Sequence, residues 1–537
     1  MRASRAWTWL ALAVVATGCS HCGSKAARQS AERLIPSGGH FILAVPNLGA
    51  LADRAQALLA TARGGAGGQQ LVAWSANLAR QLGFDPLTRD GLKAAGIDPQ
   101  ASLALAAGGS SGPGVLVAIP VGDESVLEAT VDRLAKDRAD ARVKSTRSVQ
   151  GKTVTVLSRA SDHAPLFAYA PREGFLLLGV GRDAARDVAQ ALLLAPEKSI
   201  AASPLYLASR QKVGPRDIYF YLPRSGSKRF GLVPDVAAVG LKLSAKELAA
   251  RAYLALPNAQ DQAWAATVVG GGAAELAELP RGAPFYLRGG IDWPAVAKQL
   301  GQSRDGGFSL GMLREAARSN GIDLDEDVLQ NLAPGFALSL GLAPKASLAT
   351  ALDFDPRISN PFHTYSLVAV GQVKDAKRAA ATLAKLSEAL NQCATCGLTV
   401  TSARAGSVLV YTERYAEGEG LSWALVGKEL VVSGGERLPA ILASIQAKKD
   451  TLKSTDFAPA ATSALFGEPG IACAADFEEL GQMVKALPDS AYGTGPSSFM
   501  VRSLISGVVD PLSRLTVVAA VAPVAGGVTL DLSVAAK

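Results

Sequence analysis

The sequence predicts an α+β protein of two tandem homologous halves, with antiparallel-dominated sheets and helices packed on one face. The first reason is that one order of strand and helix patterns occurs twice along the 537 residues. The second is that most connections between predicted strands are too short for parallel crossovers. The third is a composition of 49% apolar and 19% charged residues, which excludes a disordered chain and supports real cores.

Each predicted half opens with a proline-glycine turn, a strand and a helix. Residues 35–43 (IPSGGHFIL) return as 279–287 (LPRGAPFYL), and helical patterns follow at 48–59 and 293–300. The Gly-Ile-Asp sequence at 96–98 then matches that at 321–323, each ahead of another predicted strand. The preserved order indicates a duplication.

The match continues through a capped helix and a set of hairpins. Asp123 and Asp375 each stand where a helix N-cap is expected, before helices ending near Lys136 and Leu390. The remaining paired features are strands at 103–107 and 336–340, strands at 115–120 and 366–370, strand pairs at 143–157 and 398–411, and hairpins at 167–173 and 423–429.

Both halves are expected to end in strands. These are 218–222 with 239–256 in the first half and 515–534 in the second, with helices at 477–487 and 499–508. We therefore place the halves at residues 31–278 and 279–537. The glycine-rich segment 63–68 is a predicted flexible loop of the first half alone.

The N-terminus reads as a lipoprotein signal peptide, residues 1–18. Arg2 and Arg5 precede a short apolar run, and Ala16-Thr17-Gly18-Cys19 resembles the lipobox of bacterial lipoproteins, in which the cysteine is acylated and becomes the new N-terminus. An ordinary signal peptide is the alternative, and Cys22 is the rival acceptor, although His21 fits poorly before it. The resemblance implies lipidation at Cys19, a flexible tether over 19–30 and a membrane anchor. Because Ser20 is not the Asp that retains enteric lipoproteins in the inner membrane, we expect the outer membrane.

Charge and hydropathy argue against nucleic acid as a partner and against a membrane-spanning segment near the C-terminus. Loss of residues 1–18 lowers the net charge from +7 to +5, and the basic stretch 224–229 lacks interleaved aromatics, so we expect no nucleic-acid binding. Mean hydropathy is +0.20, yet the most apolar stretch, 515–536, is broken by Pro523 and contains Asp531. A strand hairpin is expected there rather than a membrane span.

A serine motif, Gly108-Gly109-Ser110-Ser111-Gly112, matches the nucleophile elbow. The next segment is another strand rather than a helix, so a hairpin loop is expected. A hydrolase reading would need His40, His163 or His363 as its base.

A glycine motif, Gly179-Val180-Gly181-Arg182-Asp183-Ala184, matches a dinucleotide-binding turn. No second strand with a ribose-binding acid follows, so we expect close packing of helix on strand and no cofactor.

Two further patterns resemble metal or redox sites. Cys393 and Cys396 form a C-x-x-C after a helix, which favours a small structural disulfide outside the cytoplasm. Cys22 and Cys473 are a possible second pair. The acidic run from Asp323 to Asp327 lacks the spacing of a calcium loop, so helix capping is expected and no metal.

The repeated Pro-strand-helix-Gly-Ile-Asp plan, closed by Ser203-Pro204-Leu205-Tyr206 and by Thr455-Asp456-Phe457, resembles a family of uncharacterised bacterial envelope lipoproteins. The resemblance implies no assigned activity and no catalytic residues. We therefore expect a non-enzymatic, envelope-anchored protein that binds an unknown envelope protein or lipid through a sheet face or a cleft. The alternative is a periplasmic carrier or chaperone for lipid or another hydrophobic ligand, and a hydrolase is third.

Overall fold

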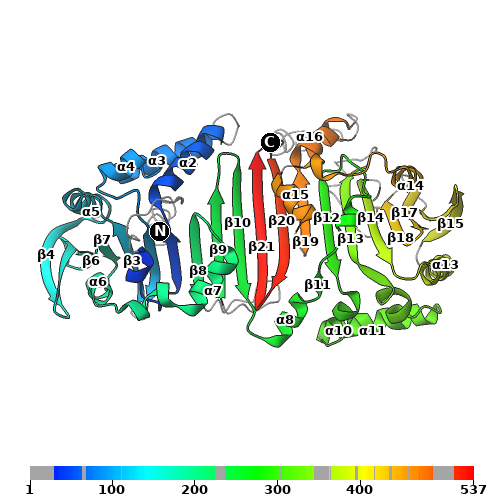
Figure 1. Ribbon diagram of the computed structural model, residues 1–537, viewed down its shortest axis with the longest axis horizontal. Helices are drawn as coiled ribbons and strands as arrows, with labels where there is room; N and C mark the ends of the chain where they lie inside the picture. The colour runs from blue at the N-terminus through cyan, green and yellow to red at the C-terminus, as the bar shows by residue number, and fades with distance from the viewer. Residues whose placement is uncertain are drawn as a thin grey trace. The chain divides into compact units, whose positions relative to one another are not determined.

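The computed structural model divides the chain into two compact units, 1–257 and 258–537 (Figure 1). The division falls between Pro257 and Asn258, whereas the predicted halves divide at 278. The structure describes residues 30–62, 68–109, 112–223, 236–302, 304–343, 362, 364–393, 397–415, 418–434, 438–457, 459–467, 470–487, 491, 513 and 515–536. The signal peptide, the tether, most of the segment 63–68 and the predicted helix 499–508 lie outside these residues.

The described strands of unit 1 form one antiparallel sheet. Each strand hydrogen-bonds only to antiparallel neighbours, as expected for short hairpin connections. The order across the sheet is β4 (Ala141–Val149), β5 (Lys152–Arg159), β6 (Pro165–Arg172), β7 (Phe175–Val180), β3 (Gly112–Pro120), β2 (Leu103–Gly109), β1 (Phe41–Val45), β8 (Ile218–Pro223), β9 (Val236–Leu243) and β10 (Glu247–Ala255).

The helices of unit 1 cover both faces of this sheet, so the prediction of helices on one face is wrong. On one face, Leu127 and Val131 of α5 (Glu124–Ala139) pack in a cluster with Leu178 of β7. On the other, Val188 of α6 (Ala184–Leu192) lies against Gly179, the next residue of β7. Neighbouring residues of a strand point to opposite faces. The physical reason is that β7 is apolar on both sides and needs two covers.

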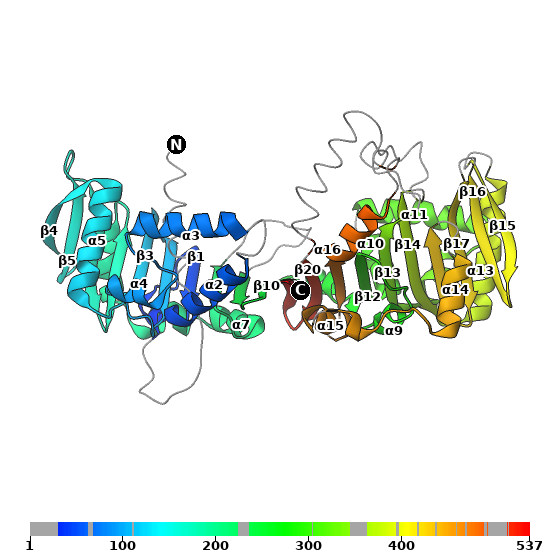
Figure 2. The ribbon, with the colours of Figure 1, turned by 90° about the horizontal axis from the view of Figure 1, so that it is seen from above.

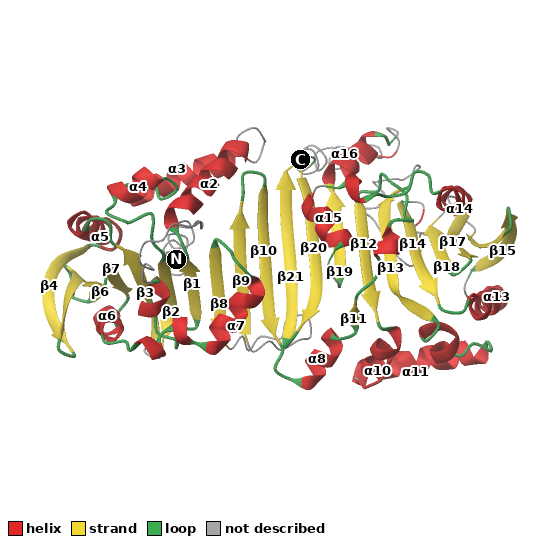
Figure 3. Cartoon of the chain, in the orientation of Figure 1, coloured by secondary structure: helices red, strands yellow, loops and turns green. Residues whose placement is uncertain are grey.

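The other helices of unit 1 stand in the segments of chain that precede or connect these strands. They are η1 (Ala31–Leu34), α2 (Leu48–Ala62), α3 (Gly68–Leu82) and α4 (Arg89–Ala94) in the N-terminal part, and η2 (Pro196–Lys198), η3 (Ile200–Ala202) and α7 (Pro204–Val213) before β8 (Figure 3).

Unit 2 repeats the strand order of unit 1 within its described residues. The order is β15 (Leu398–Ala405), β16 (Val408–Tyr415), β17 (Gly418–Val426), β18 (Glu429–Gly434), β14 (Tyr365–Val373), β13 (Leu332–Leu342), β12 (Phe285–Ile291), β19 (Ile471–Asp476), β20 (Leu515–Val524) and β21 (Gly527–Ala536), all antiparallel. A short strand, β11 (Val268–Val269), also pairs with the end of β12.

Figure 2 shows most of the helices of unit 2 beside the strands of their own unit. The helices of unit 2 are α8 (Ala259–Ala265), α9 (Ala273–Leu276), α10 (Trp293–Gln302), α11 (Arg304–Ser319), the π-helical turn η4 (Leu324–Leu329), α13 (Ala376–Gln392), α14 (Leu438–Ala447), η6 (Ser454–Asp456), α15 (Pro459–Phe466) and α16 (Phe477–Lys485).

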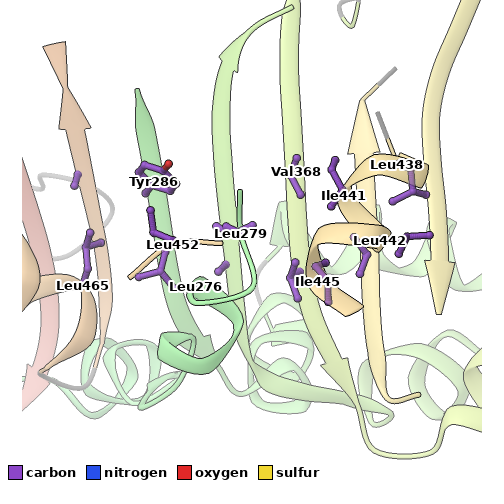
Figure 4. Packing of buried hydrophobic residues seen from close by; sticks show 14 of the residues in the cluster. Leu276, Leu279, Tyr286, Val368, Leu438, Ile441, Leu442, Ile445, Leu452 and Leu465 are labelled. Carbon is purple, nitrogen blue, oxygen red and sulfur yellow. The ribbon is translucent and has the colours of Figure 1, made fainter. Parts of the chain in front are cut away.

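The largest described core of unit 2 lies where α14 and α15 meet the sheet. Ile441 and Leu442 of α14 pack toward Val368 of β14, and Leu465 of α15 joins the same cluster with Tyr286 of β12 (Figure 4). All five side chains are at least nine-tenths buried. This core fixes α14 against β14 and thereby shapes the cleft described next.

The predicted caps and turns are present in both units. Asp123 accepts a hydrogen bond from the Val126 amide, and Asp375 accepts from the amide of Arg378. Gly96 and Gly321 both have left-handed backbones, with φ of 78° and 66°, which suits glycine at a helix end.

Candidate functional site: a cleft present in both units

The larger cleft, called cleft 2 below, lies in unit 2 and has a volume of about 270 Å³. Residues of β13, β14, α14 and the turn before β12 line it, together with Met483 of α16. The lining residues are Glu278, Pro280, Arg281, Gly282, Ala283, Ser339, Gly341, Ser366, Val368, Ala440, Ile441, Ser444 and Met483.

A smaller cleft, cleft 1, lies in unit 1 and has a volume of about 100 Å³. Its lining residues are Pro36, Gly38, Gly39, Ala106, Ala107, Gly108, Gly114, Leu116, Asp187 and Gln190.

Strand register shows that the two clefts occupy the same place in the two sheets. Phe41 pairs with Ala107 as Phe285 pairs with Leu340. Each next pairing also corresponds: Ala107 with Val115 and Leu340 with Leu367, then Leu116 with Gly179 and Val368 with Ser433. The lining residues that coincide on this register are Pro36 and Pro280, Gly38 and Gly282, Gly39 and Ala283, Ala106 and Ser339, Gly108 and Gly341, Gly114 and Ser366, and Leu116 and Val368.

The helical walls correspond as well. Gly179 and Ser433 occupy the same place in the two sheets. Counting onward from each by the same number of residues aligns Asp187 with Ile441 and Gln190 with Ser444. The same backbone arrangement therefore has different side chains in the two clefts. Cleft 1 is lined mainly by glycine and alanine, with Asp187 and Gln190 on its helix, whereas cleft 2 has serines in its strands and Ile441 and Ser444 on its helix.

The proline-glycine turns are fastened in the same way. Pro36 forms a β-bridge with Ser199, and Pro280 forms one with Thr451. The Ser37 amide donates to the Lys198 carbonyl at 3.2 Å. In unit 2, the amide of Arg281 donates to Asp450 at the same distance. Each turn is therefore held over its cleft by backbone contacts.

Cleft 2 contains polar groups that the protein leaves without partners. Ser339 is 3% exposed, and its hydroxyl has no hydrogen-bond partner in the described part of the chain. Within the same residues, the carboxylate of Glu278 forms no ion pair. Arg281, by contrast, pairs with Asp456 at 2.9 Å and donates to the Thr451 carbonyl at 3.0 Å. A buried polar group without a partner costs free energy unless water or a ligand supplies one.

The surroundings of cleft 2 are negative. Burial raises the pKa of Glu429, and the nearby carboxylates of Glu278 and Glu275 raise it further, while Lys448 acts against them. Burial also raises the pKa of Tyr286 to about 12, although the Ala283 amide that donates to its oxygen acts in the opposite direction.

Unit 1 also has an apolar cavity of about 110 Å³ between α5 and the sheet. Its lining is apolar apart from Thr130 and comprises Leu82, Phe84, Pro86, Leu92, Ile97, Leu103, Leu105, Val115, Val117, Ile119, Leu127, Thr130, Val131, Leu134, Leu178 and Val180. An engineered apolar cavity of about 150 Å³ holds benzene. The cavity in unit 1 therefore has room for a small apolar group, not for a whole lipid.

The serine and histidine candidates are only partly described. Ser110 and His363 lie outside the described residues, so the hairpin serine stays a prediction. His40 is exposed, and its Cδ2 would lie 2.9 Å from a Cβ built on Gly108. His163 lies in an exposed turn with φ of 51°.

The glycine motif packs as the sequence predicts. A Cβ on Gly179 would lie 2.6 Å from the carbonyl oxygen of Ala184, the first residue of α6. After α6 the chain forms the 3-10 turns η2 and η3 and then α7 rather than a strand. Close contact between β7 and α6 thus accounts for this glycine.

The cysteine predictions are partly outside the described residues. Cys393 is disulfide-bonded, and its proposed partner Cys396 is not described, so the pairing stays a prediction. Cys473 is exposed and unbridged. The free Cys473 overturns the suggested second pair with Cys22. Cys19 is not described, so its lipidation stays a prediction.

The acidic run caps a helix, as predicted, and is paired with arginines. Asp323 accepts from the Glu326 amide at 2.9 Å. Asp325 binds Arg314 at 2.7 Å, while Asp327 and Glu326 bind Arg378 at 2.8 Å each. In the residues that the structure describes, no cluster of His, Cys, Asp or Glu is arranged to hold a metal.

The fold and the repeated cleft define the chain as a two-unit α+β protein with a candidate small-ligand site. No protein-family model and no curated protein matches it. Solved structures of TP0453 are similar in part. Crystal form III is 11% identical over 44% of this chain and 82% of that one, form I is 11% identical over 43% and 81%, and form IV is 8% identical over 43% and 81%. The TM-score is 0.25 in each case, and a likeness at this level carries no argument.

Among the described helices, none combines the length and the apolar character needed to cross a bilayer.

Proposed function

We propose that the protein is a non-enzymatic, lipid-anchored envelope protein that binds a ligand in the cleft that both units share. The observation that carries the proposal is this shared cleft: the same turn, strands and helix enclose a hollow in each unit, and the linings differ. Close packing alone does not require a hollow at the same place in both units. Duplication of an ancestral unit is supported by the shared strand order.

The anchor belongs to the same proposal and rests on the sequence. Cys19 carries the lipid, residues 19–30 form the tether, and the body faces the periplasm or the cell surface from the outer membrane. Several acyl chains on one cysteine exceed the two signals that stable anchoring needs.

A carrier of a hydrophobic ligand is the second candidate, and the apolar cavity of unit 1 favours it. Its volume of about 110 Å³ would accept the end of a chain rather than an entire lipid, so we place it second.

Two experiments test the proposal. For the anchor, Cys19→Ala should move the protein from the membrane fraction to the soluble fraction, and retention in the membrane would contradict lipidation.

For the cleft, a photo-reactive amino acid replaces Ser444 at the wall of cleft 2 or Gln190 in cleft 1 in cells. The exposed neighbour Ala443 is the matched control. We expect a cross-linked species from a cleft position and none from 443. Equal cross-linking at all three positions would contradict a binding cleft.

A further inference from the structure

We propose that cleft 2 binds a small organic ammonium ion, held by the carboxylate of Glu278 and the hydroxyl of Ser339. This inference rests on the proposed function, because it assigns a ligand class to the same cleft.

The charge of the lining favours a cation. Glu278 is unpaired within the described residues, whereas the positive charge of Arg281 is neutralised by Asp456 at 2.9 Å. Glu429 lies near this wall: burial raises its pKa, the charges of Glu278 and Glu275 raise it further, and Lys448 lowers it. An ammonium ion placed beside Glu278 would relieve this excess of negative charge.

The hydroxyl of Ser339 indicates that the ligand also has hydrogen-bonding capacity. Ser339 lines the cleft at 3% exposure and has no partner in the described protein. A serine oxygen accepts hydrogen bonds, and an ammonium group has three donors. An ammonium group in cleft 2 therefore offers donors that suit both acceptors of the lining, the Glu278 carboxylate and the Ser339 hydroxyl.

Size and apolar lining define the rest of the ligand. A volume of about 270 Å³ lies just below the usual range for drug-sized ligands of roughly 300–1,000 Å³. Val368 and Ile441 line the cleft beside Ser339 and would contact carbon atoms. The ligand is thus an amine on a short apolar body.

Cleft 1 provides an internal comparison. Leu34 stands before the Pro36 turn where Glu278 stands before the Pro280 turn, and Ala106 replaces Ser339. Cleft 1 is also much smaller, at about 100 Å³. We therefore expect one ammonium site per chain, in unit 2.

The test is calorimetric titration of the full-length protein in non-ionic detergent at low salt. The probes are n-butylammonium, the neutral n-butanol and the anionic butyrate. Wild-type protein should bind butylammonium at one site and the other two probes at least tenfold more weakly. Glu278→Gln should weaken butylammonium binding at least tenfold, or about 1.4 kcal/mol, and Ser339→Ala several-fold.

Asp187→Asn in cleft 1 is the matched control and should leave the affinity unchanged. Thermal unfolding of each variant verifies that it is folded. An unchanged affinity in a folded Glu278→Gln protein would overturn the inference. Preferred binding of butanol or butyrate would also overturn it, yet would leave a ligand-binding cleft in place. If no probe binds, the inference fails, and the cross-linking at Ser444 decides the proposed function separately.

Discussion

Replacement of Glu32 by Gln tests how η1 is held against α7. The carboxylate of Glu32 is 6% exposed and accepts a hydrogen bond from the Tyr206 hydroxyl at 2.7 Å. Arg210 donates to both carboxylate oxygens, at 2.7 and 2.6 Å. Burial lowers the pKa of Arg210, but the charge and hydrogen bond of Glu32 together with the neighbouring Tyr206 and Tyr219 raise it overall. This cluster joins η1, the first described segment, to α7.

The expected loss is about 2 kcal/mol of unfolding free energy. Removing one partner of a fully buried ion pair costs about 3–5 kcal/mol. The side chain of Arg210 is 30% exposed, so water rehydrates part of the guanidinium and reduces the loss. For a unit of this size the midpoint should fall by about 4–8 °C.

The assay is thermal unfolding combined with hydrogen exchange of peptides from η1 and α7. Both peptides should exchange faster in Glu32→Gln. The control is Glu197→Gln, because Glu197 is exposed and forms no ion pair among the described residues; its effect should stay within about 0.5 kcal/mol. Equal stability of the two variants would refute the reasoning.

Three further predictions concern the shared architecture. Gly179→Ser introduces the residue found at the same place in unit 2. It should lower the free energy of urea unfolding by about 1–3 kcal/mol, because a Cβ would lie 2.6 Å from the Ala184 carbonyl oxygen. The reverse change, Ser433→Gly, should cost less, and equal losses would contradict the close packing at Gly179. Asp123→Ala and Asp375→Ala should each lower the midpoint of urea unfolding, because each removes a helix cap. A lower midpoint in one variant alone would argue against equivalent caps. Burial of Tyr286 raises its pKa to about 12 from an ordinary value near 10. The stability that this group contributes is therefore complete below pH 10 and is lost as the pH rises through 12. In Tyr286→Phe, the alkaline decrease in unfolding free energy should be smaller by up to about 2–3 kcal/mol, and an unchanged dependence on pH would count against burial as its cause.

Local features of the fold could be predicted from the sequence because they depend on few neighbouring residues. Asp123 and Asp375 cap their helices through side-chain hydrogen bonds within one turn. The prediction of helices on only one face of the sheet was wrong although the sequence carried a contrary signal. The continuous apolar run of β7, Phe175–Val180, is typical of a strand that is buried on both faces.

The clefts could not be predicted in the same way, because they depend on register between distant strands. Ser339 and Glu278 are ordinary residues in sequence, and only the pairing of β12 with β13 brings them to one hollow. The repeat was nevertheless a usable signal. Aligning the two copies places Ser339 opposite Ala106 and Glu278 opposite Leu34, which are polar replacements at apolar positions.

A ligand that occupies cleft 2 in the cell should shield the wall of that cleft from reagents. The most direct measurement is the rate at which a membrane-permeant thiol reagent labels Ser444→Cys, in intact cells and in the purified full-length protein. Ala443→Cys is the matched control, and the exposed Cys473 is replaced by alanine in both. We predict that position 444 is protected in cells but labelled in the purified protein, with position 443 labelled equally in both. Equal labelling of position 444 in cells and in the purified protein would contradict occupancy of cleft 2 by a ligand.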